Sequence, residues 1–268
     1  MRCQYRMRFG MGIGLGLILM GLGIGCGGKQ HILTVAGSTA FQATAVELAN
    51  RYSGNHPEVT VTAEAIGSAA GREAVLAGTA DIGMIDSEGG GGMPTGLVGT
   101  VVAWDAIAVI VHPDNPVIGL TSAQVRDIFA GRIKNWAEVG GRDSAINRML
   151  REQGSGTRLI FEDRLGINVS EGNVVISDSN GAVREMVAND AQAIGYISRG
   201  SLTRRVRAVS IDGEDCTEDR IAARQYQLAH PILMVTREVV PAKAGNFILF
   251  VLSDEGRDVV RQGGFVVP

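Results

Sequence analysis

The sequence has few cysteines: three in 268 residues, of which Cys3 and Cys26 belong to its first 26 residues. Cys216 is the only cysteine in the remainder, so no internal disulfide is available there and the fold must be held by a hydrophobic core. A composition of 45% hydrophobic and 20% charged residues supplies such a core and is typical of a soluble globular protein with one large or two modest domains.

Basic charge is also scarce. The formal net charge is −3, from 25 Lys and Arg against 28 Asp and Glu. Three of the arginines lie in the first eight residues, and without them the balance is 22 minus 28, or −6. This charge excludes an overall basic surface for nucleic acid, so we expect no nucleic-acid partner.

Motifs of common enzymes are absent. Three of the four histidines, His56, His112 and His230, directly precede proline, and none has the spacing of a metal ligand to a carboxylate or cysteine. There is no G-x-S-x-G elbow and no G-x-x-x-x-G-K-[ST] loop. We therefore expect no catalytic residue, no metal site and no cofactor. The alternative is a phosphoryl-transfer or ester-hydrolysing enzyme, which would need an activated nucleophile or a metal-held water.

No apolar run is long enough to favour a membrane-spanning helix. The uncharged stretch at residues 9–25 follows Arg2, Arg6 and Arg8, is interrupted by glycines, and falls short of about 20 apolar residues. This layout predicts a secretory signal peptide at residues 1–25.

The end of this leader predicts a lipid anchor. "LGIGC" resembles a lipobox, with the large aliphatic residue displaced by one to Leu22 and Gly23 in its place, so we expect lipidation of Cys26. A single anchor would tether the protein to a membrane surface without spanning it. Ordinary cleavage nearby is the alternative.

After residue 31, short aliphatic runs alternate with longer amphipathic ones. Predicted strands are 32–36, 59–65, 81–85, 101–113, 146–150, 193–198 and 231–238; predicted helices are 41–52, 69–78, 121–131, 156–166, 180–190 and 244–260. Thr121 and Gln124 form a capping box at the start of the third helix. Residues 88–96 and 211–220 are read as loops. The alternation predicts an α/β fold with a mostly parallel sheet and helices on its faces.

Three junctions between a strand and a helix share glycine and hydroxyl residues: "AGSTAF" (36–41), "IGSAAG" (66–71) and "GSGTR" (154–158). The first backbone N–H groups of a helix lack partners and bind anions. Parallel strands direct such junctions to one edge of the sheet, and Arg151 adds a planar fork that matches two oxygens of a tetrahedral oxyanion. The alternative is that these hydroxyls only cap their own helices.

Asp86 follows a strand at the same level as these junctions. A carboxylate repels an anion unless the anion carries a proton that the carboxylate can accept. Phosphate near neutral pH is protonated and sulfate is not, so Asp86 would select phosphate. The alternative is a turn or capping role for Asp86.

Several segments together resemble a known family. "AGSTAF", "AIGSAAGREAVLAGTADIGMID", "AIAVIVHPDNPV", "LTSAQVRDIFAGRIKNWAEVGG", "REQGSGTR" and "AIGYIS" are similar, in order and spacing, to the phosphate-binding proteins of bacterial phosphate-specific ABC importers. The resemblance implies two α/β lobes joined by crossover strands, which we place at residues 31–103 plus 228–268 and at 104–227. It also implies a periplasmic or cell-surface receptor, lipid-anchored to the membrane, with inorganic phosphate and the permease and ATPase subunits of an importer as partners.

The resemblance also implies a set of phosphate-binding residues: Thr39, Ala40, Ser68, Asp86, Arg151, Ser155, Gly156 and Thr157. The chain departs from the family at Ala69 and Ala70, where glycine is more usual, and at Glu88, near which many short members carry an arginine. Arg151 is then the only motif cation expected to serve the ligand.

Three alternatives stay open at this stage. A sulfate or molybdate receptor is the rival within the class of binding proteins, and a tethered phosphate sensor that meets no permease is another possibility. "KNWAEVGG" (134–141) fits either a permease-docking surface or a core role for Trp136.

Overall fold

The computed structural model describes residues 31–86, 95–169, 172 and 174–268. The predicted leader at residues 1–25, Cys26, Glu88 and most of the glycine-rich segment at 88–96 lie outside these residues.

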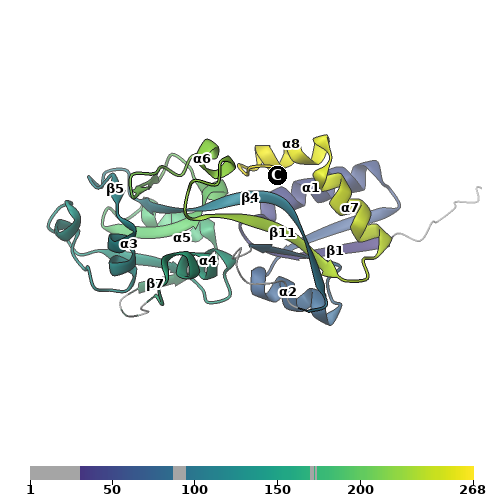
Figure 1. Cartoon of the computed structure of the whole chain (residues 1–268), viewed down its shortest axis with the longest axis horizontal. Helices are drawn as coiled ribbons and strands as arrows, with labels where there is room; N and C mark the ends of the chain where they lie inside the picture. The colour runs from purple at the N-terminus through teal and green to yellow at the C-terminus, as the bar shows by residue number, and fades with distance from the viewer. Residues whose placement is uncertain (1–30, 87–94, 170–171, 173) are drawn as a thin grey trace, which may run out of the picture.

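Within the described residues, nine strands form one sheet that runs through the molecule (Figure 1). The strand order is β2-β1-β3-β11-β4-β8-β6-β7, and β9 also pairs with β4. The strands are β1 (His31–Gly37), β2 (Val59–Ala65), β3 (Ile82–Asp86), β4 (Leu97–Val111), β6 (Asn147–Arg151), β7 (Val174–Ser177), β8 (Ala193–Ser198), β9 (Arg207–Ala208) and β11 (Ala229–Arg237). The short strands β5 (Gly119–Leu120) and β10 (Ser210–Ile211) pair separately.

The sheet has two parallel parts, as predicted. Strands β2, β1 and β3 are mutually parallel, and so are β7, β6 and β8. The antiparallel strands β11 and β4 lie between these groups. Because parallel strands end at one edge, each group presents its strand-to-helix turns together.

Strands β4 and β11 cross from one lobe to the other. β4 pairs with β11 from Leu97 to Ala106 and then with β8 from Ile107 to Val111. The predicted boundary between residues 103 and 104 falls inside β4, and the one between 227 and 228 falls beside the start of β11. The crossover is observed, and these boundaries remain predictions.

Helices cover both lobes (Figure 1). The first lobe carries α1 (Gln42–Asn55), α2 (Ser68–Ala77), α7 (Ala242–Leu252) and α8 (Asp254–Gln262). The second lobe carries α3 (Ser122–Phe129), α4 (Gly156–Leu165), α5 (Asn180–Ala188), α6 (Glu218–Ala222) and the 3-10 turns Trp136–Val139 and Arg199–Ser201. The capping box of Thr121 and Gln124 at the start of α3 is confirmed.

Two predicted elements differ from the structure. The helix expected at 244–260 is two helices, because Ser253 has extended backbone and its Oγ accepts a hydrogen bond from the Gly256 N–H, which starts α8 anew. The loop expected at 211–220 contains the end of β10 and the start of α6, whose first turn is capped by Thr217.

Each lobe has its own hydrophobic core. In the first lobe Phe41, Met84 and Phe247 are fully buried between the sheet and the helices. In the second lobe Phe161 stacks on Tyr196, with ring centroids 4.0 Å apart. Trp136 belongs to this second core, where its Nε1 donates to the Gln192 carbonyl at 2.9 Å. Of the two roles weighed for Trp136, the structure supports the core role.

Candidate anion-binding cleft

The three predicted junctions and the end of β3 meet between the two lobes. From the first lobe come Thr39 and Ala40 after β1, Ser68 at the start of α2, and Asp86 at the end of β3. The second lobe contributes Arg151 at the end of β6, with the segment 155–157 that begins α4. The structure thus brings Arg151 to Thr39, and Gly156 to Ser68 and Asp86. Ala40, Ser155 and Thr157 are the chain neighbours of these residues.

The Asp86 carboxylate sits among hydroxyl groups. Ser38 Oγ donates to it, 3.0 Å from Oδ1 and 3.1 Å from Oδ2, and Ser68 Oγ donates to Oδ2 at 3.2 Å. The Asp86 N–H in turn donates to Ser68 Oγ at 3.2 Å. All three residues are buried. Asp86 is therefore held by two serines, one in the loop after β1 and one at the start of α2.

Ser38 was not among the predicted binding residues. Its Oγ also accepts the Ala40 N–H at 3.2 Å, and its own N–H donates to the Met84 carbonyl of β3 at 2.8 Å. Ser38 thus ties the first loop to the strand that carries Asp86. Ser38 could have been found from its position in "AGSTAF", directly before Thr39. The sequence analysis assigned this segment to the anion-binding loop but gave Ser38 no role of its own.

The capping alternative holds for one junction of the three. Helix α1 begins after Phe41 and helix α2 after Gly67, and neither N-cap residue makes a side-chain capping bond. Ser155 does cap α4, because its Oγ accepts the Arg158 N–H at 3.3 Å. The hydroxyls of the first two junctions therefore bond Asp86 and Arg151 and do not cap their own helices.

The lobes approach closely at two glycines. A Cβ atom on Gly156 would lie 2.4 Å from both Asp86 Oδ2 and Ser68 Oγ, so only glycine fits between α4 and these first-lobe groups. Gly67 has a φ of 89° and faces the Gly154 carbonyl across the cleft. The start of α4 therefore packs directly against Asp86 and Ser68.

Arg151 is fully buried and spans the lobes. Its Nη2 donates to Thr39 Oγ1 of the first lobe and to the Asp178 carbonyl of the second, both at 3.1 Å. The Nε and Nη2 edge forms a bidentate pair with Glu152, at 3.1 and 3.0 Å. Nη1 has no hydrogen-bond partner among the described residues. From the sequence we expected the planar guanidinium of Arg151 to bind two oxygens of the anion. In the structure its Nε and Nη2 edge binds Glu152 instead, and Nη1 is the nitrogen that remains for a ligand.

The second arginine of "REQGSGTR" has a supporting role. Arg158 Nη1 donates to the Arg151 carbonyl at 3.0 Å, and its Nε pairs with Glu162 at 3.0 Å. This contact fixes the end of β6 against α4, and Glu162 balances the charge.

Comparison with known proteins identifies the family of this chain. A family model described as the PBP superfamily domain matches residues 26–255. The phosphate-binding protein PstS of Bacillus subtilis is 30% identical over 241 residues, covering 87% of this chain and 80% of that protein. The chain belongs to the PstS family of phosphate-binding proteins.

Solved structures agree with this family. A substrate-binding protein of Clostridium perfringens, solved with phosphate bound, is 33% identical with a TM-score of 0.83; the match covers 89% of this chain and all of that one. An ABC-type phosphate transport receptor of Vibrio cholerae is 32% identical with a TM-score of 0.76, over 88% of this chain and all of that one. The family consists of receptors that bind a substrate outside the cytoplasm.

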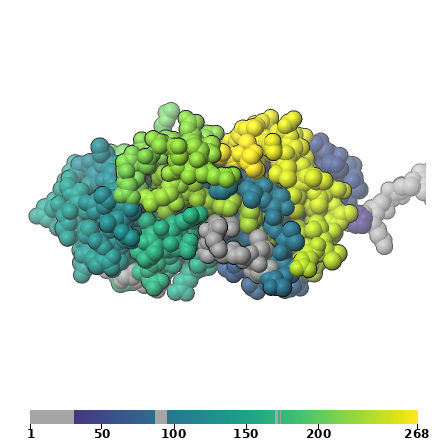
Figure 2. All heavy atoms as spheres, in the orientation of Figure 1, coloured from purple at the N-terminus to yellow at the C-terminus, as the bar shows by residue number. Residues whose placement is uncertain are grey.

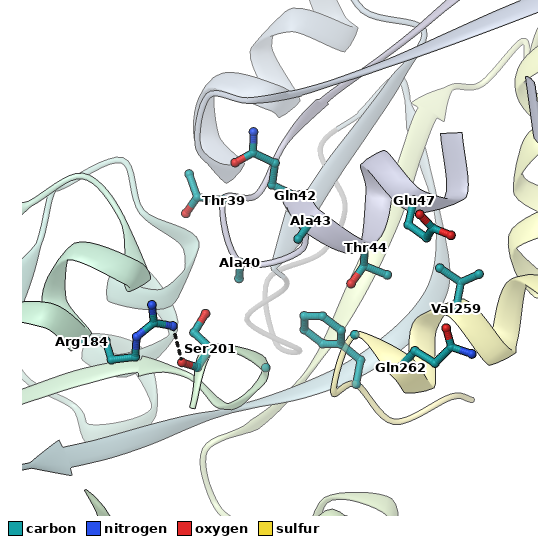
Figure 3. Close-up of a pocket in the computed structure, with 13 residues that line it drawn as sticks. Thr39, Ala40, Gln42, Ala43, Thr44, Glu47, Arg184, Ser201, Val259 and Gln262 are labelled. Atoms are coloured by element: carbon teal, nitrogen blue, oxygen red, sulfur yellow. Dashed lines mark hydrogen bonds between the residues drawn. The ribbon is translucent and has the colours of Figure 1, made fainter. Parts of the chain in front are cut away.

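In this member of the PstS family, two hollows lie along the interface of the lobes. One, of about 640 Å³, is lined by Thr39, Gln42 and Gly67 of the first lobe and by Glu152 and Asn180 of the second. The other, of about 420 Å³, lies between α1, α8 and the turn at Gly200 and Ser201. Figure 3 shows Thr39 and Ala40 at its edge, opposite Arg184, which donates to the Ser201 carbonyl. Thr39 lines both hollows and Ala40 lines the smaller one, whereas the other six predicted residues line neither.

A fourth junction was missed by the sequence analysis. Ser179 caps α5, the Asp178 carbonyl accepts from Arg151, and Asn180 is buried at the cleft. The signal was the segment "SDSNGA", which places hydroxyl and amide residues between β7 and α5 as in the other three junctions.

Two features are absent from the described residues. They contain no group of three or more His, Cys, Asp or Glu side chains placed to hold a metal ion. No helix within the same part of the chain has the length and apolarity needed to cross a bilayer.

Proposed function

We propose that this protein is an extracytoplasmic receptor that binds inorganic phosphate between its lobes and delivers it to the permease of an ABC importer. The observation that carries the proposal is the buried Asp86, held by Ser38 and Ser68 and facing the start of α4 beside Arg151. Membership in the PstS family and the phosphate-bound relative support it.

The chemistry of the cleft fits a protonated tetrahedral anion. Hydroxyl and N–H donors, one guanidinium and one carboxylate acceptor would surround the ligand, with phosphate held by Thr39, Ala40, Ser68, Asp86, Arg151, Ser155, Gly156 and Thr157. In this arrangement Asp86 accepts the proton of phosphate, and a sulfate ion would leave two negative groups facing each other.

Binding and closure are coupled in this proposal. Donors of the first lobe and of the second lobe can reach the same anion only when the lobes are together, so the ligand favours the closed state. Closure also removes water, and each buried donor then depends on the ligand for its hydrogen bond.

We further propose that the protein is not an enzyme. The buried charged groups of the cleft already have partners: Asp86 accepts from two serines, Arg151 pairs with Glu152, and Arg158 pairs with Glu162. An esterase or phosphotransferase would instead need an activated nucleophile. Incubation with a phosphate ester tests this point, because release of phosphate with ordinary turnover would contradict it.

The tether and the partners complete the proposal. Cleavage before Cys26 and lipidation of its thiol would hold the receptor at a membrane surface beside the permease and ATPase subunits of the importer. Mass spectrometry of the N-terminal peptide distinguishes a lipidated Cys26 from ordinary cleavage. Permease and ATPase genes beside this one would favour transport, and their absence would favour a sensor.

Equilibrium binding tests the ligand directly. Protein purified free of phosphate is titrated with radiolabelled phosphate, with sulfate, arsenate and molybdate as competitors. We expect one phosphate per chain and weak competition by sulfate. Tighter binding of sulfate or molybdate would overturn the assignment.

A further inference from the structure

Asn180 occupies the cleft wall of the second lobe at the first position of α5. It is 3% exposed, and it lines the hollow of about 640 Å³ together with Thr39 and Gly67 of the first lobe. Asn180 is not one of the predicted binding residues. It does not cap α5 either, because the N-cap residue is Ser179.

The orientation of its side-chain amide follows from one contact. The Ser198 N–H lies 3.2 Å from Oδ1, and a backbone N–H can only donate, so the amide oxygen faces β8. Nδ2 therefore points to the opposite side, where no described residue accepts a hydrogen bond from it. A buried donor without an acceptor is rare in native proteins and costs about 1–3 kcal/mol.

A second buried donor without a partner belongs to the same cluster. Arg151 Nη1 lacks an acceptor among the described residues, while Nη2 of the same guanidinium binds the carbonyl of Asp178, two residues before Asn180. Two donors from one wall of the cleft are thus available to acceptors from outside the chain, and the oxygens of an oxyanion supply several.

We propose that Asn180 is a further anion-binding residue, whose Nδ2 donates to an oxygen of the bound anion beside Arg151 Nη1. This inference rests on the proposed function and deepens it. The amide adds a donor without adding charge, in a cleft where Glu152 already balances Arg151. The first turn of α5 adds its own partial positive charge.

The test compares Asn180→Asp with Asn180→Ala. Aspartate has the same shape and keeps an acceptor for the Ser198 N–H, but it replaces the Nδ2 donor by a carboxylate oxygen. If Nδ2 faces the anion, we expect Asn180→Asp to weaken phosphate binding about 100-fold or more and Asn180→Ala only about tenfold. If Asn180 only supports Ser198, the order reverses, with aspartate the milder change. That order would overturn the inference.

Asn115 offers a matched control. It is 4% exposed, its Oδ1 accepts the Val117 N–H at 3.0 Å, and it lines neither hollow. Asn115→Asp should leave the phosphate dissociation constant within about twofold, since Asn115 lies in the turn after β4 and lines neither hollow. Thermal unfolding without phosphate separates losses of stability from losses of affinity for every variant.

Two outcomes separate the inference from the proposed function. If the unaltered protein fails to bind phosphate, the proposed function fails. If it binds and Asn180→Asp matches the Asn115→Asp control, only the role of Asn180 fails. Should Asn180→Asp not fold, Asn180→Ser replaces it: its hydroxyl can donate, so it should bind phosphate several-fold more tightly than Asn180→Ala, and equal affinity would overturn the inference.

Discussion

At the scale of single residues, the cleft depends on how each polar group is already paired. Asp86 accepts from Ser38 and Ser68, and Arg151 gives one edge to Glu152. On these two residues, a lone pair of Asp86 and Nη1 of Arg151 remain for a ligand. Selectivity therefore rests on the contacts that orient these two groups as much as on the groups themselves.

The first prediction concerns Asp86. The Asp86→Asn substitution would keep the shape and the acceptor for Ser38 while adding a donor toward the ligand, so sulfate would no longer meet a like charge. We expect the preference for phosphate over sulfate to fall by about two powers of ten, measured by competition binding. Asp163→Asn, on the exposed face of α4, is the control for the loss of one charge. An unchanged ratio would remove Asp86 from the selectivity mechanism.

The second prediction concerns Ser38, which the sequence analysis passed over. Ser38→Ala removes a donor to Asp86 and the acceptor for the Ala40 N–H. A hydrogen bond to a charged group contributes roughly 1.5–3 kcal/mol, so phosphate affinity should fall by about tenfold or more. Ser38→Thr restores the hydroxyl and should recover most of it by isothermal titration. Equal affinities for Ser38→Ala and the unaltered protein would contradict this role.

Residue identities were predictable from the sequence, but pairings were not. The positions of Thr39, Ser68, Asp86 and Arg151 at strand ends follow from the alternation of strands and helices and from the family resemblance. The contact of Arg151 with Glu152 could not be predicted in this way. Both residues lie where β6 ends, and beyond the strand the alternation of side chains between the two faces of the sheet no longer determines which way they point. The bond from Ser38 to Asp86 joins a loop to the end of β3, 48 residues apart in the chain, and no local pattern encodes it.

At the scale of elements, the junction between a strand and a helix is the repeated unit of the site. Three such junctions were predicted, and the fourth, before α5, has the same composition. Helix ends were predictable where a cap stood out, as at Thr121, and were missed where apolar spacing continued across a cap. Residues 244–260 show this error: α7 is almost entirely apolar, and that pattern hid the signal of Ser253 followed by Asp254 and Glu255.

The third prediction tests the role of Ser253 in separating α7 from α8. Ser253 Oγ accepts the Gly256 N–H and donates to the Phe250 carbonyl at 2.6 Å, so it holds both helix ends. Ser253→Ala should lower the free energy of unfolding, measured by urea denaturation, by about 0.5–2 kcal/mol. Ser253→Asn should keep most of the stability of the unaltered protein, because asparagine is a good N-cap residue. Equal losses of unfolding free energy in the two variants would show that the cap at Ser253 does not stabilise the junction of α7 and α8. Phosphate affinity should change in neither, because α8 lies outside the proposed binding residues.

At the scale of the whole molecule, the two lobes are joined by β4 and β11 and meet again at the cleft. Figure 2 shows the second lobe, in teal and green, packed against the yellow C-terminal helices of the first. A buried polar chain runs along this joint: Asn180 accepts from Ser198, and Ser198 Oγ bonds Asp105 of β4. His230 of β11 lies in register with Asp105. The cleft and the crossover strands are therefore linked through fully buried groups.

Asp105 makes the stability of this joint depend on pH. Burial raises the pKa of its carboxyl, although His230 and the Ser198 hydroxyl oppose the shift. Asp86 of β3 adds to the rise. A carboxyl with a raised pKa holds its proton more tightly in the folded state than in the unfolded state. Its contribution to stability is therefore present below the unfolded pKa of about 4 and is lost as pH rises through the folded pKa.

The fourth prediction follows from this sign. Asp105→Asn removes the ionisation while keeping the shape, so the unaltered protein should lose stability relative to this variant as pH rises from about 4 through the folded pKa of Asp105, and the difference should be constant outside that window. Urea unfolding at a series of pH values, in phosphate-free buffer, measures it. Asp163→Asn removes one exposed carboxyl and corrects for the change in net charge. A difference that stays constant from about pH 3 to 8 would mean that Asp105 keeps the same ionisation in the folded and unfolded states, with His230 compensating its burial in full.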